Sequence, residues 1–198
     1  MSNYANGNYY LSEAEMTANA EYIYSVLTEW GWSLNAICAL LANMQAESTI
    51  NPGIYEGLDD TRTDNGFGLV QWTPNTKYKE WADQYGYQYD DLYGQLERIR
   101  FEMENGLQWI ETERYPMSFS EFSTSTENLT YLTNAFMNNY ERPADTNQPQ
   151  RAYYARQWWA HFNGGEEPDP EPDPEPEPVP VKKGMLLIYK YIATRRWF

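Results

Sequence analysis

The chain has 198 residues and a formal net charge of −15, with 29 acidic and 14 basic side chains. This length fits one domain with short extensions, in which about 150 residues can bury a substantial core. Acidic residues also outnumber basic ones before Glu166, so electrostatic binding of nucleic acid or of another anionic polymer is not expected.

The chain offers few metal-binding or thiol side chains. Cys38 is the only cysteine and His161 the only histidine. A single cysteine forms no intramolecular disulfide, and we expect Cys38 to be a small buried side chain. We predict no metal site and no cofactor, with metal binding by carboxylates alone as the remaining alternative.

The N-terminal residues do not resemble a secretory signal, because they are polar and uncharged and acidic residues follow them. We predict that residues 1–10 form a flexible N-terminus. No stretch of the sequence is apolar enough to span a bilayer, so no transmembrane segment is expected.

Apolar residues at three- and four-residue spacing predict a mainly helical domain over residues 11–163. Its first helix opens with a capping box of Ser12 and Glu15 and closes at Gly31. The second helix has Ser33 as its N-cap. Its apolar residues predict a single buried stripe: Leu34, Ile37, Leu40, Leu41 and Met44.

Glu47 continues that stripe, three residues after Met44, just before the helix breaks at Pro52-Gly53. Its carboxyl group is therefore expected at the edge of the core, where desolvation favours the protonated form that a general acid needs. The alternative is an ordinary glutamate at a helix end, with its carboxylate in solvent.

The segment between Pro52 and Gly66 is rich in turn-forming residues, and short apolar patches flank it. The pattern predicts a small β-hairpin or irregular sheet, the only β structure expected in the chain. The predicted fold class is α+β, mainly α, with this hairpin beside the helix that carries Glu47.

Further helices are predicted from capping residues and apolar spacing. One starts at Thr73-Pro74, one near Asp90, a short one at Ser118 with a capping box, and one at Thr126 that delivers Tyr140-Glu141-Arg142-Pro143. The last runs from Pro149 to Phe162.

Residues 164–181 alternate acids with prolines and predict an extended linker, because such a run cannot form a helix. Residues 182–198 form a short basic and apolar tail. This tail fits a peptide that docks to a partner or to a membrane surface, and a disordered remnant of a longer chain is the alternative.

Two groups of residues resemble a known superfamily. Glu47-Ser48 followed by Asn51-Pro52, and a Gly-x-Gly-Leu-x-Gln-x-x-Pro-x-Thr run from Gly66 to Thr76, are similar to the lysozyme-like enzymes, which include lytic transglycosylases and goose-type lysozymes. Gln71-Trp72 and the later Tyr140-Glu141-Arg142-Pro143 bring the resemblance closer to the phage tail lysozymes. The resemblance covers residues 11–162 and implies a lysozyme-like fold.

The resemblance also implies roles for single residues. Glu47 matches the catalytic acid, Gln71 a residue of the cleft, and Tyr140 the tyrosine of a Tyr-Asn motif beside that acid. Glu141 replaces the asparagine of this motif, and we group it with the substrate-binding candidates. We single out Trp72, next to Gln71, for stacking on a sugar ring.

Glycosidic cleavage commonly uses a second group across the bond from the acid. The candidates from the predicted hairpin are Asp59, Asp60 and Asp64, with solvated turn residues as the alternative. Lytic transglycosylases work with one glutamate and the C6 hydroxyl group of the sugar, so hydrolysis and anhydro-forming cleavage both stay open.

We therefore predict a tail lysozyme that cleaves the β-1,4 bond between N-acetylmuramic acid and N-acetylglucosamine in bacterial peptidoglycan. Its expected location is the phage virion, with other tail proteins as partners, or otherwise the host cytoplasm before release to the wall. The alternatives are a lytic transglycosylase, an endolysin, and a wall-binding module without activity.

Overall fold

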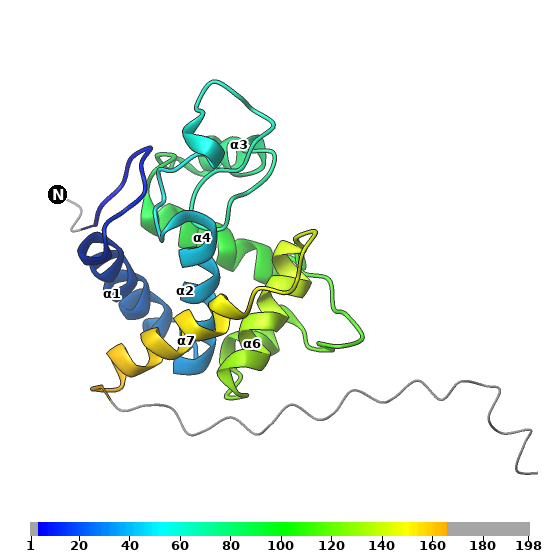
Figure 1. Ribbon diagram of the computed structural model, residues 1–198. Coiled ribbons are helices and arrows are strands. Elements are labelled where there is room, and N and C mark those ends of the chain that lie inside the picture. The colour runs from blue at the N-terminus through cyan, green and yellow to red at the C-terminus, as the bar shows by residue number, and fades with distance from the viewer. Residues whose placement is uncertain (1–3, 166–198) are drawn as a thin grey trace, which may run out of the picture.

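The computed structural model describes residues 4–165, which form a helical domain (Figure 1). The mainly helical prediction is confirmed. Within that range there are seven α-helices, a 3-10 turn η1 and a π-helical turn η2: α1 (Glu13–Glu29), α2 (Leu34–Ser48), η1 (Glu56–Leu58), α3 (Thr76–Tyr85), α4 (Leu92–Glu104), α5 (Phe119–Thr124), α6 (Leu129–Phe136), η2 (Met137–Glu141) and α7 (Pro149–Phe162).

Helix α2 is the centre of the domain and packs against α1, α5, α6 and α7 (Figure 1). Every residue from Ala36 to Met44 is buried, so α2 is enclosed on all sides rather than along the single predicted stripe. Alanines between the larger side chains allow neighbouring helices to approach closely from each direction. Cys38 lies in this core, as predicted.

Local capping explains where several helices begin. The carboxylate of Glu15 accepts hydrogen bonds from the backbone and side chain of Ser12, and Glu121 does the same for Ser118. Ser33 Oγ accepts from Ala36 N, so these three predicted starts are confirmed.

Two predicted helix starts are wrong. Helix α3 begins at Thr76 with Asn75 as its N-cap, and Thr73-Pro74 lies in the turn before it. Helix α6 begins at Leu129, where the side chain of Asn128 accepts a hydrogen bond from Tyr131 N, so Asn128 and not Thr126 is the cap.

The predicted β-hairpin is also wrong as regular β structure. In residues 4–165 the only antiparallel pairing there is one isolated bridge between Tyr55 and Phe67. Besides a few backbone–backbone hydrogen bonds, side chains satisfy backbone groups of this loop: Gln95 accepts from Leu69 N and donates to Pro52 O, and Glu56 accepts from Gly66 N. The observed class in this part of the chain is therefore mainly α, with a loop in place of the hairpin.

Part of the N-terminal segment lies against the domain. Asn19, which is fully buried, bonds both backbone groups of Ala5, and Asn51 donates to the carbonyl oxygens of Gly7 and Tyr9. The predicted tail over residues 182–198, and the linker after Gly165, lie outside the described residues. No helix within residues 4–165 has the length and apolar character needed to cross a membrane.

Candidate active site

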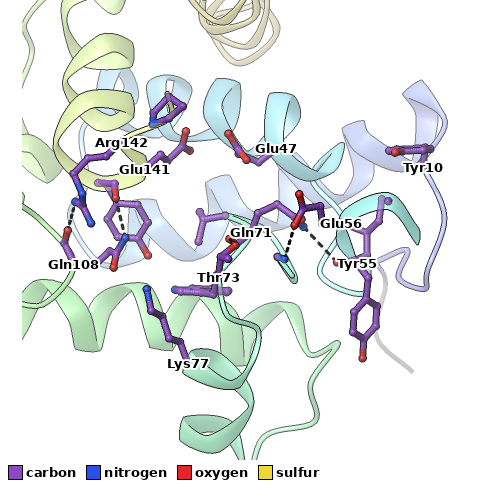
Figure 2. A pocket seen from close by; sticks show the side chains of 17 residues that line it. Tyr10, Glu47, Tyr55, Glu56, Gln71, Thr73, Lys77, Gln108, Glu141 and Arg142 are labelled. Atoms are coloured by element: carbon purple, nitrogen blue, oxygen red, sulfur yellow. Dashed lines mark hydrogen bonds between the residues drawn. The ribbon is translucent and has the colours of Figure 1, made fainter. Parts of the chain in front are cut away.

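The residues singled out by the sequence meet at a cavity of about 550 Å³ where the C-terminal end of α2 faces the loop of residues 54–73 (Figure 2). The π-helical turn η2 and the residues after it form the third wall, and α3 adds Lys77. Among the predicted site residues, five line the cavity: Glu47, Gln71, Trp72, Tyr140 and Glu141.

Glu47 stands at the last turn of α2 with 23% of its side chain exposed, between the core and the cavity. The predicted placement at the edge of the core is confirmed. Its Oε1 accepts a hydrogen bond from Nη2 of Arg151, a residue of α7, at 2.5 Å. Glu47 therefore presents a partly exposed carboxyl group whose other side is held by a buried cation.

Arg151 is the residue that the sequence analysis missed. Its side chain is 3% exposed, and it donates to Glu47, to Glu141 Oε2 at 2.5 Å, and to Asn43 Oδ1 at 2.7 Å. Sequence spacing held a signal, because Arg151 stands four and seven residues before the buried Ala155 and Trp158. An arginine on an apolar helix face indicates a buried partner of opposite charge.

Glu141 lies beside Glu47, and Figure 2 shows the two carboxyl groups turned toward one another. Its side chain is 5% exposed, and its Oε1 is buried without a hydrogen-bond partner among the described residues. Burial raises the pKa of Glu141 well above its ordinary value, and the charge of Glu47 raises it further against the opposing effect of Arg151. Glu141 is thus a carboxyl group that retains its proton readily.

Tyr140 and Trp72 line the cavity but are almost fully buried, and both point their polar atoms at Glu102 of α4. The Tyr140 hydroxyl group donates to Glu102 Oε2, and Trp72 Nε1 donates to Glu102 Oε1 at 3.1 Å. The Trp72 ring also stacks on Tyr78 with centroids 4.8 Å apart. These contacts leave little free ring surface on Trp72 and fix both aromatic residues as cleft wall.

Gln71 reaches the cavity from a strained position of the loop, with φ of 50°. Its Nε2 donates to Gly68 O at 2.9 Å, and its side chain passes so close to Gly66 that a Cβ there would lie 2.6 Å from Gln71 Oε1. Glycine at position 66 is therefore required for Gln71 to lie along the cavity.

The three aspartates do not line this cavity. Asp59 accepts hydrogen bonds from Thr61, and Asp64 pairs with Arg62 on the exposed side of the loop. Glu56, from the same loop, does line the cavity, and sequence reasoning missed it because the aspartates were the more obvious turn carboxylates. The carboxyl groups around the cavity are Glu47, Glu141 and Glu56.

Basic side chains also line the cavity. Lys77 extends from α3, and Arg142, which follows Glu141, donates to the carbonyl oxygen of Gln108 at 2.5 Å (Figure 2). No cluster of three or more histidine, cysteine or carboxylate side chains suited to a metal ion occurs in residues 4–165. The cavity thus offers acid and base groups and hydrogen-bond donors to a polar substrate.

Comparison with known proteins agrees with this arrangement. Residues 18–162 match the phage tail lysozyme family. The chain is also 50% identical over 157 residues to morphogenesis protein 1 of Bacillus phage B103, an alignment that covers 79% of this chain and 42% of that relative. The chain therefore spans less than half the length of the relative it matches. By its sequence and the extent of the match, the chain belongs to the phage tail lysozyme family.

Proposed function

We propose that the chain cleaves the glycan strands of bacterial peptidoglycan at the β-1,4 bond after N-acetylmuramic acid, with Glu47 as the general acid. The observation that carries this proposal is the position of Glu47, a partly exposed carboxyl group that lines a cavity of about 550 Å³ in a domain of the phage tail lysozyme family. Glu47 protonates the oxygen of the leaving sugar as the glycosidic bond breaks.

The other cavity residues bind and orient the sugars. Gln71 and Glu56 border the cavity on the loop side, and the Tyr140 ring closes its floor. Lys77 and Arg142 supply positive charge for the carboxylate groups of the stem peptides that peptidoglycan carries. Recognition then depends on these local groups rather than on the charge of the whole chain, which is negative.

The reaction can be completed by hydrolysis or by transglycosylation, and these two routes differ in whether a second carboxylate takes part. Because Asp59, Asp60 and Asp64 do not line the cavity and Glu56 does, Glu56 is the loop carboxylate that we assign as the second group. In hydrolysis Glu56 assists the attacking water. In a lytic transglycosylase the C6 hydroxyl group of the sugar attacks instead, and Glu56 has no catalytic duty.

Digestion of purified peptidoglycan, followed by mass analysis of the released muropeptides, tests the proposal. We expect the intact chain and Glu80→Gln, an exposed glutamate of α3, to release the same products, and Glu47→Gln to release about a thousandfold less. Reducing ends together with loss of activity in Glu56→Gln indicate hydrolysis. Anhydro ends together with an active Glu56→Gln indicate transglycosylation.

Full activity in a folded Glu47→Gln variant would contradict the proposed mechanism. Absence of activity in every variant, with binding to the wall retained, would favour a wall-binding module. Circular dichroism of each variant separates loss of the catalytic group from loss of the fold.

We further propose that the chain acts as part of the phage tail, with other tail proteins as partners. Its similarity to a phage morphogenesis protein supports this location. Purified virions probed with an antibody against the domain test it. The protein is expected in the particles, whereas its presence only in the lysate would indicate an endolysin.

A further inference from the structure

We propose that Glu47 and Glu141 form a carboxyl pair that holds one proton between them over Arg151, with Glu141 as a positioning residue for the catalytic acid. This inference rests on the proposed function, because it assigns a role to the neighbour of Glu47 in that reaction. It gives Glu141 a task other than contact with the substrate.

The geometry is that of one guanidinium group shared by two carboxyl groups. Arg151 reaches Glu141 Oε2 through Nη1 and Glu47 Oε1 through Nη2, both at 2.5 Å. Its remaining contacts are neutral, because Nη1 also donates to Asn43 and Nε donates to Gln148 Oε1 at 2.7 Å. The guanidinium group is therefore fixed from α2, η2 and α7 together.

Charge balance requires a proton at this site. Arg151 and Glu141 are 3% and 5% exposed and Glu47 is 23% exposed, so two ionised carboxylates beside one guanidinium group would leave one negative charge uncompensated in a largely buried site. Glu141 Oε1 is buried and accepts no hydrogen bond from any residue between 4 and 165. A proton on this oxygen makes it a donor to Glu47, neutralises the group of three, and accounts for the otherwise unpaired atom.

Arg151 is the cation that compensates the negative charge of the two carboxyl groups. Among the described residues it is the only charged group hydrogen-bonded to either carboxyl group. Glu56, Lys77 and Arg142 line the same cavity, with Glu56 on the loop and Lys77 on α3. Burial and the neighbouring charge of Glu47 both raise the pKa of Glu141, which agrees with a proton held here.

The pair has a defined part in the reaction. When the glycosidic bond breaks, the single proton of the pair passes from Glu141 to Glu47 and on to the oxygen of the leaving sugar, where it forms the new O–H bond. The two carboxylates that remain share the positive charge of Arg151. The attacking hydroxyl group forms the new C–O bond and returns its proton to the pair, so the site regains its single proton.

The pH dependence of kcat on solubilised peptidoglycan strands tests the pair. Glu141→Gln keeps the size and a hydrogen-bond donor but removes the second acid, so Arg151 acts on Glu47 alone. We expect the alkaline limb of the profile to move to lower pH by about one unit or more, with KM changed by less than about twofold. Glu80→Gln is the matched control and leaves the profile unchanged.

Arg151→Gln gives the opposite result under the same proposal. Without the cation the pair retains its proton more strongly, so the alkaline limb moves to higher pH by about one unit or more. Opposite shifts in two variants of one contact are not produced by a merely structural role. If both folded variants keep the wild-type limb, the pair does not exist as proposed.

A measurement on the unmodified pair covers the case in which a variant fails to fold. Titration of ¹³C-labelled glutamate side chains by NMR follows Glu141 directly in the wild type and in Glu47→Gln. We expect Glu141 to lose its proton at lower pH when Glu47 is neutral, and an unchanged titration would overturn the proposal. An inactive Glu47→Gln with an unchanged Glu141 titration would leave the proposed function intact and reject only the pair.

Discussion

Glu102 lies behind the cavity wall and holds two of the residues that line the cavity, Tyr140 and Trp72. Its Oε1 accepts hydrogen bonds from Trp72 and, at 2.8 Å, from Arg98, and its Oε2 accepts one from Tyr140. Burial raises the pKa of Glu102, partly opposed by these hydrogen bonds and by the charge of Arg98. The position of both aromatic side chains therefore depends on a carboxyl group that never meets the substrate.

We predict that Glu102→Gln lowers the free energy of unfolding at pH 4 by about 1–3 kcal/mol, since the amide cannot replace every accepting position. Because the pKa of Glu102 is raised in the folded state, its contribution to stability is complete below about pH 4 and declines as the pH rises through the raised value. The difference in the free energy of unfolding between the wild type and Glu102→Gln should therefore become smaller toward pH 7.

Urea unfolding at several pH values measures this difference. Glu104→Gln, at the exposed end of the same helix, is the control and should show a small difference that does not follow the same course. If the difference in the free energy of unfolding between the wild type and Glu102→Gln grows toward pH 7, the prediction is wrong.

At the scale of elements, the loop of residues 52–73 owes its shape to side chains from elsewhere. Gln95, on α4, bonds Leu69 N at 2.8 Å and Pro52 O at 2.6 Å. Gly68 allows this approach, since a Cβ there would lie 2.6 Å from Gln95 Oε1. The loop that carries Gln71 is thus held in place by α4 through this buried amide, in addition to the hydrogen bond between Trp72 and Glu102.

We predict that Gly68→Ala is more damaging than Gly31→Ala. Both glycines have positive φ, 78° and 82°, but a Cβ at Gly31 meets nothing within 4 Å. Gly31→Ala should cost about 1 kcal/mol from backbone strain alone, and Gly68→Ala about 1–3 kcal/mol more because Gln95 must move. Chemical unfolding measures the cost, and KM for peptidoglycan strands should rise only in Gly68→Ala.

The sequence predicted well those helix starts that depend on hydrogen bonds between residues close together in the sequence. Ser12 and Ser118 bond glutamates three positions away, so their helix starts could be recognised from the sequence. The prediction of a hairpin was wrong for a different reason. The turn-forming residues were identified correctly, but the hydrogen-bond partners of the loop backbone were not. Gln95 is 26 positions from Leu69, and nothing in the loop itself indicates that contact.

The same division holds for the site. Glu47, Gln71 and Tyr140 were found because their spacing resembles a family pattern, and all three line the cavity. Arg151 was missed because it meets Glu47 across 104 positions of sequence, a contact that only the packing of α7 on α2 creates. The local pattern therefore identified Glu47, and the tertiary structure revealed its counter-ion, Arg151.

At the scale of the whole molecule, the net charge of −15 opposes approach to a wall that carries anionic polymers. We predict that raising the salt concentration from about 10 to about 150 mM speeds digestion of intact walls by about threefold or more, because the repulsion is screened. Peptidoglycan stripped of those polymers should show a much smaller change. Equal salt dependence for both substrates would contradict repulsion as the cause.

The position of Arg151 on α7 has a consequence for how activity begins and ends. Synthesis runs from the N-terminus, so Glu47 and Glu141 leave the ribosome before the helix that brings their cation. A chain interrupted before α7 has both acids and no counter-ion, so the group of three charged side chains is complete only when the domain is complete. Conversely, one proteolytic cut in the exposed segment of residues 144–147 would leave Arg151 joined to Glu47 only through the packing of α7 on α2 and α6.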